Sequence, residues 1–487
     1  MTHRSRRQVI AAGAAAAVTL ALPPLPTAQQ RIVLNDASQL NPTPVIRHWI
    51  ATQRDEAAFI EHLRAELKEA AAARRPVAVG AARHSMGGQS LPRNGTAITF
   101  DIATCVPDRA AHTYRVHAGT RWKQVIATLD SLGFSPAVMQ SNHDFGVAAT
   151  FSVNAHGWPV PYGPFGTTVR ALRLMLADGT LVHCSREENA ELFALAMGGY
   201  GLFGVILDLE VDMVENLLLK PTFEVMPSHA FAARFLRAID DDRDVLMAYG
   251  RLSVARQGFF DEALLVTYRP HPTPLQGLPA ASAGGLLSSV SREIYRAQIG
   301  SERAKRARWF AETVAGPKAS AGIATRNTLM NEPVANLAGR DRWRTDILHE
   351  YFVPPEQFTA FIKGCQEIIP PTHLEFLNVT LRYVAADATS VLAFAPTRRI
   401  AAVMSFSQEI VSTAEAEMLR TTEALIDRVI ALGGTFYLPY RLHARPDQVW
   451  QAYPKVAQFI ERKRHYDPGL LFRNAMWDAY FATSIPR

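Results

Sequence analysis

The pattern of apolar and polar positions predicts short helices and strands in the first half of the chain. Residues 55–75 carry Phe59, Leu63 and Leu67 at helical spacing on a charged background, and residues 76–79 follow as a short strand. Further elements are predicted as strands at residues 97–100 and 114–118, a helix at residues 122–132 and a strand-turn-strand at residues 172–182. This order is typical of an α+β fold and not of a regular βαβ array.

A glycine-rich stretch at residues 198–204 satisfies the G-x-G-x-x-G expression of dinucleotide-binding folds. That fingerprint requires a strand before the glycines and a helix after them. Here residues 191–197 are predicted to be helical and residues 205–214 alternate as a strand, so the order is reversed. The stretch therefore does not indicate a nicotinamide site.

A second domain is expected to begin near Asn216, where the alternating and helical stretches become longer. The Pro-, Gly- and Ala-rich residues 269–285 are predicted to form a mobile surface loop. Residues 446–481 are predicted to form an amphipathic helix that closes at residues 465–469 and is followed by an aromatic tail. A chain of 487 residues suits two or three domains in total.

The N-terminus has the features of a twin-arginine export signal. Arg6 and Arg7 precede an apolar run over residues 10–22, and Thr27-Ala28 follows as an imperfect cleavage site. The apolar run is shorter than the ~20 residues that span a bilayer, so we expect a removed peptide over residues 1–28 and no stable membrane span. The protein is then expected to be exported, periplasmic or secreted, by a route that carries proteins already folded around a cofactor.

The amino-acid composition of the chain indicates which classes of binding partner are expected. The chain is 48% hydrophobic and 20% charged, which fits a globular protein with a large core. Its net charge is +6, but no Lys/Arg stripe alternates with aromatic residues, so nucleic-acid binding is not expected. Cys105, Cys184 and Cys365 lie far apart without C-x-x-C spacing, so neither a disulfide framework nor a metal site is predicted.

The stretch with the clearest chemistry is residues 77–90, where a strand opens into a turn of small residues. Such a turn can present successive backbone N–H groups to an anion such as a pyrophosphate. Ser85 and Gln89 can add side-chain hydrogen bonds. On its own, the stretch favours an ordinary turn after a strand, because a strand followed by a glycine-containing turn is common.

Together with three later segments, this loop resembles the vanillyl-alcohol-oxidase or PCMH-type FAD-linked oxidases, which include sugar, polyol and aldonolactone oxidases and cytokinin dehydrogenases. The matching segments are residues 80–89, 145–157, 174–180 and 189–206. The resemblance implies an α+β fold with a two-subdomain FAD-binding domain over residues 40–215 and a substrate (cap) domain over residues 216–445. The cap is expected to hold an antiparallel sheet flanked by helices, and residues 446–487 to return to the FAD domain.

The resemblance also implies which residues bind FAD. His84 occupies the position at which many relatives link an imidazole nitrogen to the flavin 8α-methyl carbon, and a neutral imidazole is a suitable nucleophile. The alternative is a histidine that only hydrogen-bonds the cofactor. No cysteine lies near residues 152–155, so a single attachment is expected. The implied cofactor-binding residues are Gly80, Ala81, Ala82, Arg83, His84, Ser85, Gln89, Ser141, Gly146, Ser152, His156, Ile206, Arg473 and Asn474.

The catalytic candidates lie in the second half. Arg382 matches an arginine that faces the flavin in polyol and aldonolactone oxidases, and its cation can stabilise a developing oxyanion. The chain has Thr380 where polyol oxidases have a glutamate, which counts against a polyol substrate. Arg441 is a second candidate cation, and Tyr440 or His443 a candidate proton acceptor. The alternative for Arg382 is a structural ion pair, and the alternative for Tyr440, Arg441 and His443 is a packing or surface role.

The predicted function is oxidation of a CH–OH group in a small sugar, aldonolactone or polyol-like molecule. Hydride passes to flavin N5, and oxygen or another acceptor reoxidises the flavin. Two alternatives stay open. One is amine oxidation of the cytokinin-dehydrogenase kind, because residues 84–89 resemble that loop most closely. The other is a flavin-bearing binding protein without turnover.

Overall fold

The computed structural model describes residues 32–272, 277–282, 287–315, 317, 323–333 and 341–482. The export signal predicted at residues 1–28 lies outside these residues. The predicted loop at residues 269–285 is described only in part. Its first residues still belong to a strand, because Arg269 pairs with Lys220 in the cap sheet.

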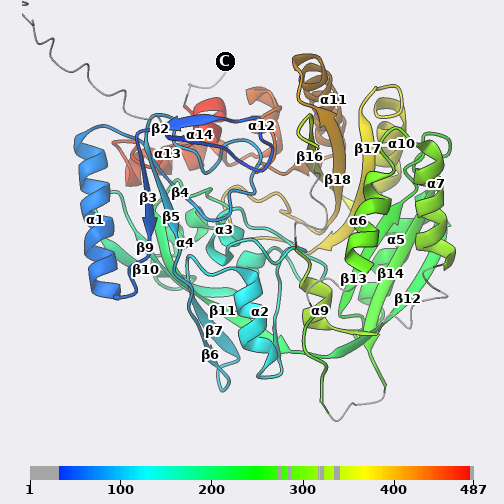
Figure 1. Cartoon of the computed structure of the whole chain (residues 1–487), viewed down its shortest axis with the longest axis horizontal. Helices are drawn as coiled ribbons and strands as arrows, with labels where there is room; N and C mark the ends of the chain where they lie inside the picture. The colour runs from blue at the N-terminus through cyan, green and yellow to red at the C-terminus, as the bar shows by residue number, and fades with distance from the viewer. Residues whose placement is uncertain are drawn as a thin grey trace, which may run out of the picture. The chain divides into compact units, whose positions relative to one another are not determined.

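The first part of the fold is a small parallel sheet covered by a long helix (Figure 1). The strands β3 (Arg47–Ala51), β5 (Thr96–Phe100) and β4 (Val77–Gly80) lie in the order β3-β5-β4. Helix α1 (Glu56–Ala72) begins where the Asp55 side chain accepts a hydrogen bond from the Ala58 N–H at 2.8 Å. Its Phe59 packs edge-to-face against Phe100 of β5 at 5.2 Å, so the apolar stripe predicted from the sequence is buried on the sheet. A short ribbon of β1 (Ile32–Leu34) and β2 (Thr43–Val45) precedes this layer.

The second part is an antiparallel sheet in the order β10-β9-β11-β7-β6, with β8 paired to the far end of β11. Its strands are β6 (Cys105–Asp108), β7 (Thr113–His117), β8 (Phe134–Pro136), β9 (Val169–Met175), β10 (Leu181–Ser185) and β11 (Val205–Glu215). The helices between them are α2 (Trp122–Asp130), α3 (Val147–Ser152) and α4 (Ala190–Ala196), with a 3-10 turn at Phe165–Thr168. The elements expected here from the apolar pattern are all present.

The third part, called the cap sheet below, is an eight-stranded antiparallel sheet in the order β15-β12-β14-β13-β17-β18-β16-β19. The strands are β12 (Leu218–Pro227), β13 (Met247–Leu252), β14 (Glu262–Pro270), β15 (Ala324–Thr325), β16 (Arg344–Val353), β17 (Glu375–Val384), β18 (Arg399–Glu409) and β19 (Thr435–Phe436).

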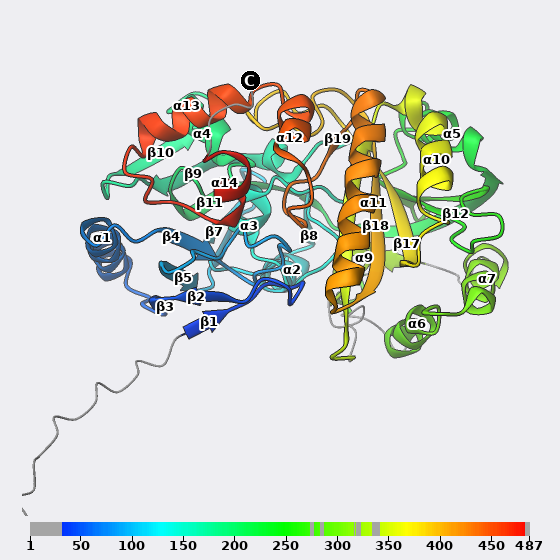
Figure 2. The ribbon, with the colours of Figure 1, turned by 90° about the horizontal axis from the view of Figure 1, so that it is seen from above.

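Helices cover one face of the cap sheet, and its other face turns toward the first two sheets (Figure 2). Tyr351 of β16, for example, packs against Phe361 of α10 with ring centroids 6.1 Å apart. The helices of this part are α5 (Ser228–Asp240), α6 (Leu287–Arg296), α7 (Glu302–Phe310), α9 (Arg326–Met330), α10 (Phe358–Ile368) and α11 (Ser412–Ala431), with a π-helical turn at Ala311–Ala315 and a 3-10 turn at Pro355–Gln357. This confirms the predicted α+β class with a cap sheet flanked by helices.

The C-terminal segment returns to the first sheet, where the Val77 N–H donates to Leu471 O at 2.7 Å. The single amphipathic helix predicted from residue 446 is wrong, because the structure has α12 (Pro446–Ala452) and α13 (Val456–Tyr466) instead. Pro454 separates them: it lacks an N–H, and it disfavours helical backbone at the residue before it. The aromatic tail also forms a helix, α14 (Ala475–Tyr480).

Within the described part of the chain, no helix is long and apolar enough to cross a membrane. Among the same residues, no group of His, Cys, Asp or Glu could hold a metal ion. The three cysteines are free thiols.

Candidate active site

A cavity of about 460 Å³ lies between the loops of the first two sheets and the uncovered face of the cap sheet. This volume falls within the range of about 300–1,000 Å³ that is typical of ligand sites. One wall consists of residues 79–90 and 140–158, and the other comes from strands β13, β16, β17 and β18 and from residues 437–440. The cavity therefore joins the two halves of the fold.

The loop after β4 has the backbone conformation of an anion-binding turn and lines this cavity. Arg83 has a φ of 53°, a left-handed conformation that lets neighbouring N–H groups converge. Among the described residues, the N–H groups of Ala82 to Ser85 donate to no protein acceptor. The buried Ser90 hydroxyl at the end of the loop also lacks a protein partner in this part of the structure. These unmatched donors fit a pyrophosphate.

The opposite side of the loop is closely packed, and only small residues fit there. A Cβ on Gly146 would lie 2.7 Å from the Cβ of Ala81, so even an alanine at this position would not fit without a shift of one segment. On the far side, Gly201 has a φ of 71° and open space where a side chain would be. A cleft whose walls are lined by such small residues suits a flat, extended cofactor. The residues present therefore fit FAD.

His84 lies on this loop and lines the cavity. Its ring is 4.3 Å from the ring of Phe145, centroid to centroid. Burial lowers the pKa of His84, opposed by Asp144 and assisted by Arg121. The imidazole is therefore largely neutral at pH 7, which is the nucleophilic form.

At the other end of the cavity, a buried carboxylate stands at the centre of a polar cluster. Glu350 of β16 has a side chain only 2% exposed and contacts His156 Nε2 through one carboxylate oxygen. Its second oxygen accepts a hydrogen bond from the Tyr440 hydroxyl at 3.3 Å. Burial first, and then the charge of Glu350, raise the pKa of Tyr440 well above its usual value, so this phenol stays protonated.

Arg382 of β17 reaches the same cluster. It donates to Ser141 Oγ at 2.6 Å and to the His156 carbonyl at 3.2 Å. Burial lowers the pKa of Arg382 and Glu350 opposes this shift, but a guanidinium remains charged at neutral pH. A buried cation and a buried carboxylate thus face the same cavity.

The register of the cap-sheet strands places Glu350 in one row with residues of three neighbouring strands. Arg251 pairs with Thr380, Thr380 with Val403, and Val403 with Glu350, so four strands present these positions side by side. All four line the cavity, and Arg382 lies two residues from Thr380 on the same face of β17. Arg251 donates to Thr380 Oγ1 at 2.5 Å.

All the predicted cofactor residues line the cavity except two. Those that line it are Gly80, Ala81, Ala82, Arg83, His84, Ser85, Gln89, Ser141, Gly146, Ser152, His156 and Ile206. Arg473 instead pairs with the exposed Asp478. Asn474 caps α14 and donates to the carbonyls of Gln89 and Tyr200, so it supports the loops of the cavity from behind.

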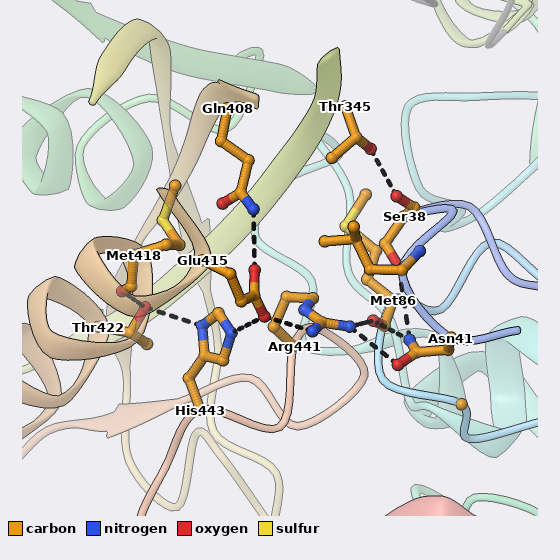
Figure 3. Close-up of polar contacts among 12 residues, drawn as sticks. Ser38, Asn41, Met86, Thr345, Gln408, Glu415, Met418, Thr422, Arg441 and His443 are labelled. Atoms are coloured by element: carbon orange, nitrogen blue, oxygen red, sulfur yellow. Dashed lines mark hydrogen bonds and ion pairs between the residues drawn. The ribbon is translucent and has the colours of Figure 1, made fainter. Parts of the chain in front are cut away.

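Of the catalytic candidates, Arg382 and Tyr440 line the cavity, whereas Arg441 and His443 do not. Figure 3 shows Arg441 and His443 on either side of Glu415, at the start of α11. Arg441 also donates to Asn41 Oδ1 at 2.9 Å, and His443 Nδ1 is 3.2 Å from Thr422 Oγ1. This Glu415 cluster ties the N-terminal segment, α11 and the C-terminal segment together, so the structure gives Arg441 and His443 bracing contacts in place of the predicted catalytic ones.

Sequence reasoning missed Glu350 and Arg251. Glu350 is a charged residue in the otherwise largely apolar stretch at residues 347–353, and a charge in a buried strand is rarely left unpaired. That signal could have marked Glu350 as a site residue. Arg251 carries no comparable signal, because only the register of β13 against β17 brings it to the cavity.

Comparison with known proteins agrees with this geometry. Residues 56–185 match the family described as FAD binding domain. This match confirms, for that segment, the resemblance to PCMH-type FAD-linked oxidases noted from the sequence.

The relatives are oxidases and dehydrogenases by name. The chain is 31% identical over 164 residues to an alditol oxidase from a Streptomyces species, covering 33% of this chain and 37% of that relative. It is 32% identical over 125 residues to cytokinin dehydrogenase 2 of Arabidopsis thaliana, covering 25% of each. It is 30% identical over 115 residues to the L-gulonolactone oxidase of Mus musculus, covering 24% of this chain and 26% of that relative. The matches thus span well under half of each relative.

Proposed function

We propose that this protein is an FAD-dependent oxidoreductase that oxidises a CH–OH group of a small hydroxylated molecule. The observation that carries the proposal is the single cavity that holds the anion-binding loop at one end and the Glu350–Arg382 cluster at the other. The names of the alditol oxidase and L-gulonolactone oxidase relatives support the same reaction class.

The side chains at the reacting end of the cavity have different roles in the proposed reaction. FAD, when bound, supplies the hydride acceptor, with oxygen or another molecule taking the electrons afterwards. Arg382 stabilises negative charge on the substrate oxygen in a site of low dielectric. A Glu350 carboxylate oxygen accepts the hydroxyl proton, while His156 and Tyr440 hold that carboxylate in place. Tyr440 is a donor here and not the proton acceptor, because its pKa is raised.

The attachment of FAD through the His84 imidazole is part of the proposal. Its support is the position of a neutral histidine on the anion-binding loop, beside Phe145. Acid precipitation tests it: the yellow colour should stay with the precipitate of the wild-type protein and pass to the supernatant for His84→Ala. Colour found wholly in the wild-type supernatant would mean that FAD is not covalently bound.

The reaction itself is tested by mixing the purified protein anaerobically with alditols, aldonolactones, sugars and amines and following flavin bleaching. Hydroxylated donors should bleach the flavin, and Arg382→Met should slow bleaching by roughly 100- to 1,000-fold. Arg441→Met is the matched control, because this arginine lies outside the cavity. Bleaching by adenine-linked amines alone would favour amine oxidation. Retained flavin that no donor reduces would favour a binding protein.

Export by the twin-arginine route is proposed from the sequence of residues 1–28. Changing both Arg6 and Arg7 to Lys should leave the protein in the cytoplasmic fraction, whereas the unaltered chain should reach the periplasm or medium. If the altered and the unaltered chain were distributed equally between these fractions, the result would contradict export by the twin-arginine route.

A further inference from the structure

Arg251 is a cation that lines the cavity from β13. Within the described ranges, no Asp or Glu oxygen lies within ion-pair distance of it. Its recorded contacts are neutral: Thr380 Oγ1 at 2.5 Å, and the Tyr249 ring, 5.4 Å from its guanidinium carbon. A guanidinium has five N–H donors, so most of them remain for a ligand.

Two carboxylate residues, Glu350 and Glu332, line the cavity, and within the described structure neither forms an ion pair with Arg251. Glu350 is engaged by His156 and Tyr440, at the other end of the row that Arg251 begins. Glu332 lies on the opposite wall, where its carbonyl accepts from Asn142 and His143. Arg382 is close enough that the charge of Arg251 contributes to lowering its pKa, and its own hydrogen-bond partners are neutral. An anion between the two guanidinium groups would relieve their repulsion.

The register gives the spacing between this cation and the reacting end. Because Arg251 leans onto Thr380, its guanidinium lies near β17, and Glu350 lies two strands further along the row. Two strand spacings are roughly 10 Å, and a hydrogen bond of about 2.8 Å at each end leaves roughly 4 Å. That length suits a short carbon chain with a carboxylate at one end.

We propose that the substrate is a short hydroxy acid whose carboxylate binds Arg251 while its hydroxyl reacts beside Glu350 and Arg382. This rests on the proposed oxidoreductase function and specifies its substrate class. A planar carboxylate matches the fork of an arginine, and such charged hydrogen bonds are the stronger kind. A neutral polyol of the same length would leave Arg251 without an anionic partner.

The test compares four-carbon donors that differ only in the terminal group. Threonate and erythronate are mixed anaerobically with the FAD-loaded enzyme beside threitol and erythritol, and the dissociation constants are taken from the saturation of flavin bleaching. The acids should bind at least about 10-fold more tightly than the alditols. Arg251→Gln should weaken the acids by roughly 10- to 100-fold and the alditols by less than about 2-fold. Arg251→Lys should retain part of the preference, because it keeps the charge without the fork.

A second readout does not depend on turnover. Calorimetric titration with butyrate and with butyramide should show binding of the anion only, and Arg251→Gln should abolish it while FAD content and melting temperature stay near wild type. Alditols that bind and react as well as the acids, or an Arg251→Gln change that weakens both equally, would overturn the inference while leaving the oxidoreductase function standing. If no donor reduces the flavin, the proposed function fails. Butyrate and butyramide still decide the role of Arg251, and equal binding of the two, or binding of neither, would reject it.

Discussion

The two walls of the cavity are built in different ways. The wall formed by residues 79–90 and 140–158 comes from two continuous stretches, and it offers backbone N–H groups and small side chains. The cap-sheet wall takes one or two side chains from each of four strands that are far apart in the sequence. The first wall suits a cofactor that is the same whatever the substrate, because its backbone N–H donors do not depend on side-chain identity. In the second wall, a single substitution on one strand can change the chemistry of the site without changing the other strands.

The largest effect is expected at the centre of the cap-sheet wall. Glu350→Gln keeps the shape but removes the proton acceptor, so anaerobic flavin reduction should slow by about 100- to 10,000-fold. The bound FAD, measured by absorbance, should be unchanged, since Glu350 lies on the other wall. A rate within a few-fold of wild type would show that the proton leaves by another route.

The Glu415 cluster has the composition of an active site but lies outside the cavity, so its loss should affect stability alone. Arg441→Met removes an ion pair with Glu415 and a hydrogen bond to Asn41. The free energy of unfolding should fall by about 2–3 kcal/mol, with the rate of flavin reduction by saturating donor unchanged. Denaturant unfolding and stopped-flow measurements on the same preparation test this. A large fall in rate without loss of stability would return Arg441 to the catalytic residues.

The wall formed by residues 79–90 and 140–158, called the cofactor wall below, is expected to be sensitive to the addition of a single methyl group. Gly146→Ala places a Cβ 2.7 Å from Ala81, which forces the two segments apart and should weaken FAD retention by about 10-fold. Gly469→Ala is the matched control, because nothing lies within 4 Å of its added Cβ. Flavin content per protein after dialysis is the measurement, with both variants made in the His84→Ala background so that no covalent bond retains the flavin. Equal flavin content in both variants would mean that the cofactor does not need this close approach.

The smallest effect is the response of the Glu415 cluster to acid. Burial would raise the pKa of Glu415, but hydrogen bonds from His443 and Arg441 outweigh burial and hold the pKa at about 2, against an ordinary 4.5. Because the folded pKa is depressed, this contribution is present above pH 4.5 and is lost as the pH falls toward 2. After allowance for solvent screening it is about 1 kcal/mol. Glu415→Gln should flatten this part of the stability profile, and an unchanged slope would contradict the assignment.

A neighbouring histidine adds to this response at higher pH. Burial, and then the charge of His443, lower the pKa of His349 to about 3 from an ordinary 6.5. Below pH 6.5 the unfolded chain gains a proton that the folded chain does not, so stability should fall progressively from there toward pH 3.

Much of the first half of the fold and of the cofactor wall was predictable, because local sequence determines both. Helix spacing placed α1, alternation placed β11, and the helix before and the strand after residues 198–204 are both present as predicted. The return of the C-terminal segment as one helix was wrong, because the effect of Pro454 outweighed the amphipathic pattern.

The sequence by itself determined the resemblance to FAD-linked oxidases, the loop of small residues that carries His84, and the candidacy of Arg382, since each is carried by a continuous stretch with its own backbone geometry. Only the tertiary structure separated Tyr440, which faces the cavity, from Arg441 and His443, which turn toward Glu415. It alone also placed Glu350 and Arg251 at opposite ends of one row. Strand register is set by the packing of the whole sheet, and a shift of one residue would turn every one of these side chains to the other face.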